Sequence, residues 1–101
     1  MAHSEDEVIE YLREVNDPEL GINLVDLGLI RGVELDERSV TVIYTLTTPA
    51  CPLNEYIDAE MDEVLKRKMP DIQAVIPKLS WEPLWNPSMM SEDAKLELGL
   101  F

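Results

Sequence analysis

The chain has 101 residues, of which 46% are hydrophobic, and its formal net charge of -13 arises from 21 acidic and 8 basic residues. This length predicts one domain over residues 1–101, since domains run from about 50 to 200 residues. The negative charge would repel nucleic acid phosphates and anionic lipid headgroups, so neither nucleic acid nor a membrane is an expected partner. The chain opens without a signal-peptide pattern, and no apolar run approaches the roughly 20 residues that span a bilayer, which predicts a cytoplasmic protein.

The first predicted element is a helix over residues 5–15. Ser4 and Glu7 have the S-x-x-E spacing of a capping box, which marks a helix start. The apolar residues that follow at helical spacing are Val8, Ile9, Leu12 and Val15. Pro18 disfavours the helical conformation at Asp17, so the helix should end near Asn16. The segment "NDPELGINLVDLGLIRG" then predicts a loop that its many apolar side chains hold in place.

A β-hairpin is predicted next, with strands over residues 30–35 and 40–48 joined by a turn over residues 36–39. In the second strand, the two-residue period of side chains places one apolar set on the core face: Val40, Val42, Tyr44 and Leu46. The opposite face is expected to be half polar, and it consists of Thr41, Ile43, Thr45 and Thr47.

A second helix should begin at Pro52, which suits the first turn of a helix, and end before Pro70. Its predicted apolar stripe consists of Leu53, Ile57, Met61, Val64 and Leu65. Residues 72–81 predict a third strand, and the missing backbone donor of Pro77 makes it either an edge strand or a strand with a bulge. The apolar residues of the following tail are expected to cover an end of the core, with a partner-binding patch as the alternative: Trp81, Trp85, Met89 and Met90. A short helix over residues 91–98 is the last predicted element.

The order helix, hairpin, helix, strand, helix predicts an α+β fold, a small two-layer sandwich with a three-stranded mixed sheet. A right-handed crossover is expected where a helix joins the second and third strands. Two positions of the third strand are compatible with this order, beside the second strand or beside the first.

Cys51 is the only cysteine of the chain, and it directly precedes the predicted start of the second helix. Unpaired N–H groups and the positive end of the helix dipole favour an anion there, so the thiol would become a better nucleophile and metal ligand. Glu55 and Asp58 in the first turns oppose this effect. The alternative interpretation is that Cys51 is a small buried apolar residue, as free cysteines often are.

The loop residues Asp17, Glu19 and Leu20 form a second candidate site around Pro18. Proline fixes the backbone between the two carboxylates, which could then bind a cation or orient a proton. The alternative is that Asp-Pro only starts a turn. His3 is expected to be an ordinary exposed residue in a frayed terminus. Cys51 and His3 are the only Cys and His of the sequence, so they cannot supply the four ligands of a closed zinc site by themselves.

Three ordered segments resemble those of a known family: "VNDPELGINLVDLGLI" from Val15, "VTVIYTLTTPACPL" from Val40 and "WEPLWNPSMMSEDAKLELG" from Trp81. They are similar to the SufT and PaaD-type proteins, small domains that are linked to iron-sulfur cluster assembly. The resemblance implies an α+β fold akin to the C-terminal domain of NifU-type scaffolds. The chain departs from NifU-type carriers by having one cysteine where they have a C-x-x-C pair.

The resemblance also implies a single site. Cys51 would be the functional thiol, followed by Pro52, with Thr47 as its companion threonine. The residues of the D-P-E-L block, Asp17, Glu19 and Leu20, would surround that thiol.

The function that this resemblance implies is that of an accessory factor in iron-sulfur cluster assembly or protein maturation. Cys51 would act as a thiolate ligand or transfer contact for a transient iron-sulfur cluster or iron, shared with a partner or, in a homodimer, with a second copy. The implied partners are assembly scaffolds, P-loop carrier proteins and recipient apoproteins. A thiol-dependent redox enzyme is one alternative, disfavoured because the chain has no resolving cysteine and no visible cofactor motif. A purely structural adaptor is the other alternative.

Overall fold

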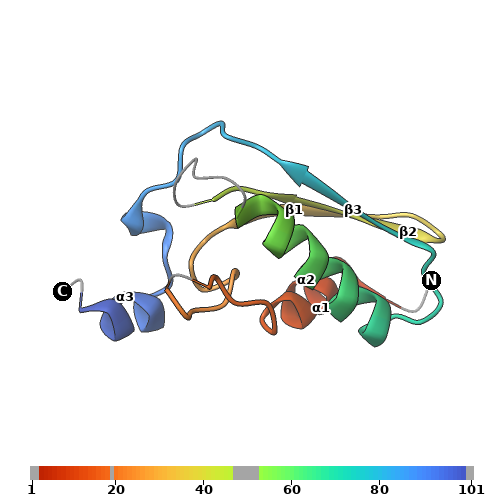
Figure 1. Cartoon of the computed structure of the whole chain (residues 1–101), viewed down its shortest axis with the longest axis horizontal. Helices are drawn as coiled ribbons and strands as arrows, with labels where there is room; N and C mark the ends of the chain where they lie inside the picture. Colours follow the sequence, from red (N-terminus) through yellow and green to blue (C-terminus); the bar gives the residue numbers. More distant parts are fainter. Residues whose placement is uncertain (1–2, 19, 47–52, 100–101) are drawn as a thin grey trace.

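A three-stranded mixed sheet with two helices against one of its faces forms the body of the molecule (Figure 1). The computed structural model describes residues 3–18, 20–46 and 53–99. The elements in chain order are α1 (Glu5–Leu12), β1 (Ile30–Leu35), β2 (Ser39–Tyr44), α2 (Leu53–Lys68), β3 (Ala74–Leu79), the 3-10 turn η1 (Pro87–Met89) and α3 (Glu92–Leu98). This arrangement confirms the predicted α+β fold with helices on a mixed sheet, while α3 lies beyond the end of the sheet (Figure 1).

The sheet has the strand order β1-β2-β3, so the third strand lies beside the second. β1 pairs antiparallel with β2, and β2 pairs parallel with β3. Pro77 therefore lies on an edge strand, the first of the two alternatives that its missing donor predicted. β3 is shorter than the predicted strand over residues 72–81, since its ladder with β2 runs only from Ala74 to Leu79.

The second strand is also shorter than the predicted range of residues 40–48, because β2 ends at Tyr44. Tyr44 is paired with Ile30, the first residue of β1, and with Leu79, the last residue of β3. Both neighbouring ladders therefore end at the same level, and beyond it the N–H of Thr45 donates to the carbonyl of Leu29 at 2.8 Å. Residues 47 and 48 lie outside the described residues.

The capping box predicted for α1 is present. The backbone N–H of Glu7 donates to Ser4 Oγ at 3.2 Å, and the backbone N–H of Ser4 donates to Glu7 Oε1 at 3.0 Å. The helix ends at Leu12, three residues before the predicted end. The Val15 carbonyl accepts from the N–H of Leu24 at 2.9 Å. Val15 is therefore hydrogen-bonded to the loop that follows and is not part of the helix.

The core lies between the sheet and the two helices, and the predicted faces supply it. On β2 and just after it, the buried side chains are Val40, Val42, Tyr44 and Leu46, and on α2 they are Ile57, Met61, Val64 and Leu65. The side chain of Leu53 lies outside the described set. The tail covers this core as expected, because Met90 is buried and Trp81 and Trp85 pack against the core.

The predicted exposure of His3 is wrong, and one residue of the half-polar face of the predicted second strand is more buried than its neighbours there. His3 has a side chain that is only 13% exposed, since its ring lies edge-on to Tyr11 and its Nε2 lies 3.3 Å from Asp71 Oδ1. Thr45, which was expected on a half-polar face, is fully buried. For His3, part of this contact comes from Asp71, which lies 68 positions away in the sequence. None of the helices in the described ranges has the length and apolar character required to cross a membrane.

Candidate functional site

The acidic loop, defined as residues 16–23, is closed by backbone hydrogen bonds. The N–H of Asp17 donates to the carbonyl of Ile22 at 2.9 Å, and the N–H of Gly21 donates to the carbonyl of Asp17 at 2.8 Å. Asn16 and Asn23 form an isolated antiparallel bridge at its base. The described part of this loop is therefore held together by its own backbone hydrogen bonds.

Asp17 is fully buried within this loop, and its Oδ1 accepts from the N–H of Leu20 at 3.1 Å. The carboxylate thus holds the turn that follows it, which is the role of a turn-starting aspartate. Leu20 is 36% exposed, unlike the other leucines of the segment. Glu19, Thr47, Cys51 and Pro52 lie outside the residues that the structure describes, so their proximity to Asp17 stays a prediction.

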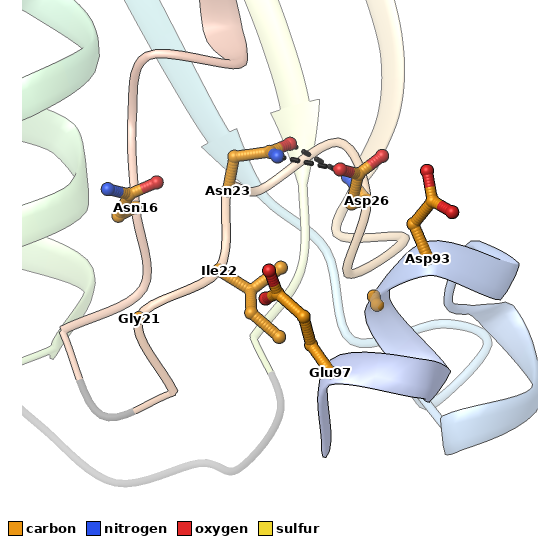
Figure 2. Close-up of a pocket in the computed structure, with 8 residues that line it drawn as sticks. Asn16, Gly21, Ile22, Asn23, Asp26, Asp93 and Glu97 are labelled. Atoms are coloured by element: carbon orange, nitrogen blue, oxygen red, sulfur yellow. Dashed lines mark hydrogen bonds between the residues drawn. The ribbon is translucent and has the colours of Figure 1, made fainter. Parts of the chain in front are cut away.

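A polar cavity of about 150 Å³ lies between the acidic loop and α3. Figure 2 shows the carboxylate of Glu97 extending toward Ile22, with Asp93 one turn earlier on the same helix. Asp26 and Asn23 form part of the opposite wall. Among the described residues, no group of three or more His, Cys, Asp or Glu is placed so that it could hold a metal ion.

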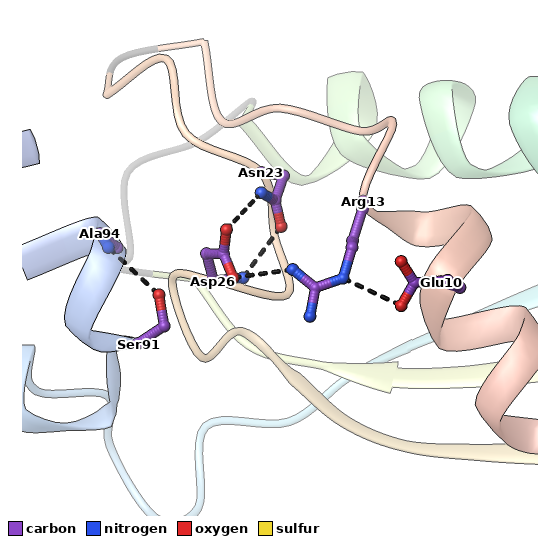
Figure 3. Close-up of polar contacts among 6 residues, drawn as sticks. All are labelled: Glu10, Arg13, Asn23, Asp26, Ser91 and Ala94. Carbon is purple, nitrogen blue, oxygen red and sulfur yellow. Dashed lines mark hydrogen bonds and ion pairs between the residues drawn. The ribbon is translucent and has the colours of Figure 1, made fainter.

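Asp26 is the centre of a polar cluster that joins three segments (Figure 3). Its Oδ1 lies 2.8 Å from Nη1 of Arg13, and its Oδ2 accepts from Nδ2 of Asn23 at 2.8 Å. Its backbone carbonyl accepts from the N–H of Ser91 at 2.7 Å. The hydrogen bond from Asn23, followed by the one from Arg13, lowers the pKa of Asp26 below its ordinary value, against the effect of burial.

This polar cluster and the cavity beside it were missed by the sequence interpretation. The only available signal was local, namely the D-L-G turn after Asn23 and the N-cap form of Ser91 before the last helix. Neither pattern indicates that residues 13, 26 and 91 meet, because their contact depends on how the tail folds back onto the loop.

The two ends of the segment that carries Cys51 are well defined. At the strand end, the buried hydroxyl of Tyr44 donates to Oδ1 of Asp58, in the second turn of α2. Burial, and then the hydrogen bond to Asp58, raise the pKa of the Tyr44 phenol, so the hydroxyl stays a donor at neutral pH. The next residue, Thr45, has a buried Oγ1 without a hydrogen-bond partner among the described residues.

Comparisons with known proteins agree with the resemblance found in the sequence. Residues 5–75 match the family described as "iron-sulfur cluster assembly protein". An Fe-S protein maturation auxiliary factor of Porphyromonas gingivalis is 40% identical over 95% of this chain and 91% of its own length. The auxiliary factor SufT of Staphylococcus aureus is 42% identical over 85% of this chain and 98% of its own length.

The fold also agrees with a solved structure. A domain of unknown function, DUF59, from Bacillus anthracis superposes with a TM-score of 0.89 at 32% identity and covers 96% of this chain and 92% of its own. A related domain also forms part of longer proteins, since an iron-sulfur cluster carrier protein of Synechocystis is 40% identical over 76% of this chain but only 22% of its own length.

Proposed function

We propose that this chain, which belongs to the family of iron-sulfur cluster assembly proteins, is an auxiliary factor in the maturation of iron-sulfur proteins. The observation that carries this proposal is the match, at 40% identity over 95% of the chain, to a protein described as such a factor. A cluster or its iron is then a cargo that passes through the protein, rather than a resident cofactor.

Cys51 is the residue to which we assign contact with that cargo. In the sequence, it precedes Leu53, the first residue of α2, by two positions. A thiol next to a helix N-terminus is favoured as thiolate, the form that binds iron. With one cysteine in the chain, a cluster would be shared with a partner protein or a second copy.

The acidic loop has a supporting role in this proposal. The buried carboxylate of Asp17 shapes the loop through its hydrogen bond to the N–H of Leu20. Glu19 would orient the cargo or its protons, and Thr47 would donate or accept a hydrogen bond beside the thiol. The partly exposed Leu20 would contact a partner.

The proposed partners are iron-sulfur carrier proteins of the P-loop type, assembly scaffolds and recipient apoproteins. Support comes from the carrier of Synechocystis, in which a related domain and the rest of the carrier are one polypeptide. A domain that is covalently joined to a carrier in one protein can act on a separate carrier when it stands alone, at the cost of a lower effective concentration.

The decisive experiment replaces Cys51 by serine in cells that depend on this protein. We expect cluster-dependent enzymes to lose activity in the Cys51→Ser strain while the protein itself accumulates normally. Ala50→Ser is the matched control, because it introduces the same hydroxyl into the neighbouring position and keeps the thiol. Full activity of cluster-dependent enzymes in the Cys51→Ser strain would contradict the thiol role and favour an adaptor.

A second measurement tests contact with the cargo. After anaerobic incubation with iron and sulfide, we expect protein-bound iron in the wild type and much less in the Cys51→Ser variant, with a mass that reports sharing between two chains. Equal iron in both proteins would show that the thiol is not a ligand.

A further inference from the structure

Both helices of the body, α1 and α2, lie against one face of the sheet, and neither covers the opposite face (Figure 1). On β2, the residues that alternate with the core side chains belong to this uncovered face, and all three are half-buried: Ser39, Thr41 and Ile43. We propose that the uncovered face is the contact surface of a symmetric dimer of two copies of this chain. This adds a defined partner surface to the proposed function and does not depend on the role of the thiol.

The middle of the uncovered face is flat and largely apolar. The register of the sheet places Ile76 of β3 beside Thr41, and Gly32 of β1 beside Ile43. Ile76 is 41% exposed. Gly32 has no side chain, and a Cβ there would lie 3.5 Å from Cδ1 of Ile43, so the isoleucine lies close to bare backbone. A second sheet can bury such a surface by packing on it at a distance of about 10 Å.

The regular part of the three strands places one acidic and one basic residue on this face, Glu34 on β1 and Lys78 on β3. Both are exposed, and neither takes part in an ion pair within the described part of the chain. Their Cα atoms lie about 12 Å apart, a distance that follows from two strand spacings and two residues of rise. The face is therefore close to neutral in a chain whose net charge is -13.

These two charges complement each other across a two-fold axis. An axis parallel to β2, between two stacked sheets, places β1 of one copy over β3 of the other. Glu34 of each copy then lies about 7 Å along the strand from Lys78 of the other, within the combined reach of the two side chains. An axis perpendicular to the strands would instead stack β1 on β1, with like charges on each side. The charges therefore favour the first arrangement.

The helices offer a poorer surface for self-association because their exposed sides are acidic. The first turns of α1 and α3 carry these acidic residues: Glu5, Asp6, Glu7, Glu92 and Asp93. Two copies that met through these turns would bring like charges together, which costs affinity. The near-neutral sheet face avoids this cost.

The size of the face sets the expected strength of the dimer. Three strands of six residues span about 14 Å by 20 Å, which is well below the roughly 800 Å² that each partner buries in a standard interface. We therefore expect a weak dimer that depends on protein concentration. An amphipathic helix of another protein can also cover an apolar sheet face, but such a helix would not require Glu34 and Lys78 to complement each other.

The test reverses these charges in the full chain and measures mass by sedimentation equilibrium at about 0.05 to 1 mM protein. Glu34→Lys and Lys78→Glu each place like charges opposite one another, whereas the double variant Glu34→Lys/Lys78→Glu exchanges the signs and keeps them complementary. Glu5→Lys on α1 and Lys95→Glu on α3 are matched controls, because they change the net charge equally on helices away from this face.

We expect the average mass of the wild type to rise with concentration towards that of a dimer. Each single reversal should weaken the dimer at least tenfold, because it places like charges opposite one another. The double variant should dimerise as the wild type does, and so should both controls. An equimolar mixture of Glu34→Lys and Lys78→Glu should also associate, since one copy then carries two lysines on this face and the other two glutamates.

A wild-type chain that stays monomeric over the whole range would overturn the inference. A dimer that both single reversals leave unchanged would also overturn it, because the contact would then lie on another face. Loss of the dimer in both variants without recovery in their mixture would rule out a charge pair and contradict the proposed arrangement. None of these outcomes affects the proposed function, which the Cys51→Ser strain tests through the activity of cluster-dependent enzymes.

Discussion

Gly28 and Gly21 both have positive φ angles, of +76° and +71°, but only Gly28 is also confined by a neighbour. A Cβ on Gly28 would lie 2.2 Å from the Met89 carbonyl oxygen, whereas a Cβ on Gly21 would meet nothing within 4 Å. The turn at Gly28 therefore allows the tail to pack directly against the backbone, and the turn at Gly21 requires only the unusual φ angle.

These two glycines give a matched pair of substitutions. Gly21→Ala should cost about 1 to 2 kcal/mol, the penalty of a left-handed conformation for a residue with a Cβ. Gly28→Ala should cost about 3 kcal/mol or more, because displacement of the η1 backbone adds an overpacking term. Urea unfolding of both variants checks this order. Equal losses of stability in the two variants would show that the backbone at Met89 can move away from residue 28 without a measurable cost.

Asp26 predicts a pH dependence of stability, because its pKa is lowered in the folded protein. A lowered pKa contributes stability above the ordinary aspartate pKa near 4, and this contribution is lost as the pH falls through the folded value. At pH 7, Asp26→Asn should therefore be less stable than the wild type by about 1 kcal/mol, a value reduced for the partial exposure of the side chain.

Urea unfolding at pH 7, 5 and 3 measures this effect. The difference between wild type and Asp26→Asn should shrink as the pH falls below the aspartate range. Glu37→Gln, in the exposed turn between β1 and β2, should leave stability at pH 7 unchanged. A difference that stays constant down to pH 3 would contradict the assignment of a lowered pKa to Asp26.

At the scale of elements, α3 is the shortest described α-helix, and it depends most on contacts with the rest of the chain. It has seven residues, too few to persist alone in water, and its stability depends on its cap and on the burial of Ala94. Ser91 caps it, with Oγ accepting from the N–H of Ala94 at 3.1 Å, and Gly99 ends it in a left-handed conformation. The tail before it is held by Trp85, whose Nε1 donates to the Leu27 carbonyl at 2.7 Å.

Removal of the α3 cap should therefore loosen this helix selectively. Ser91→Ala should destabilise α3 by about 1 kcal/mol, the usual cost of losing a serine N-cap, and hydrogen exchange should become faster in residues 92–98. The sheet and α2 should keep their protection. Ser39→Ala, at the start of β2, is the control and should not affect α3. Unchanged exchange in α3 would mean that packing alone holds it.

At the scale of the whole molecule, the net charge of -13 means that many carboxylates lie close to one another and repel one another. The described ion pairs are mostly exposed, for example those of Glu14 with Arg67 and Lys68, and such pairs contribute little individually. Self-repulsion among the excess acidic residues should therefore outweigh the attractive pairs.

Salt should accordingly stabilise the protein. Raising sodium chloride from about 20 mM to about 300 mM shortens the Debye length below 10 Å and should raise the melting temperature by a few degrees. Thermal unfolding followed by circular dichroism measures the change. A lower melting temperature in salt would mean that the attractive pairs dominate.

The sequence by itself determined what local chemistry controls. The capping box of Ser4 and Glu7 defined the start of α1, the two-residue period identified the core face of β2, and Pro77 indicated a strand at an edge or with a bulge. The three resembling segments identified the family. Each of these signals acts over a few neighbouring residues or over a linear pattern, so each can be recognised without coordinates.

Only the tertiary structure decided which distant segments meet. It placed β3 beside β2, ended β2 at Tyr44 where both neighbouring ladders end, buried Thr45, and brought His3 next to Asp71. It also joined Tyr44 to Asp58, and Arg13 to Asp26. Contacts of this kind depend on the packing of whole elements around one core. A local pattern in the sequence specifies the elements but not their neighbours.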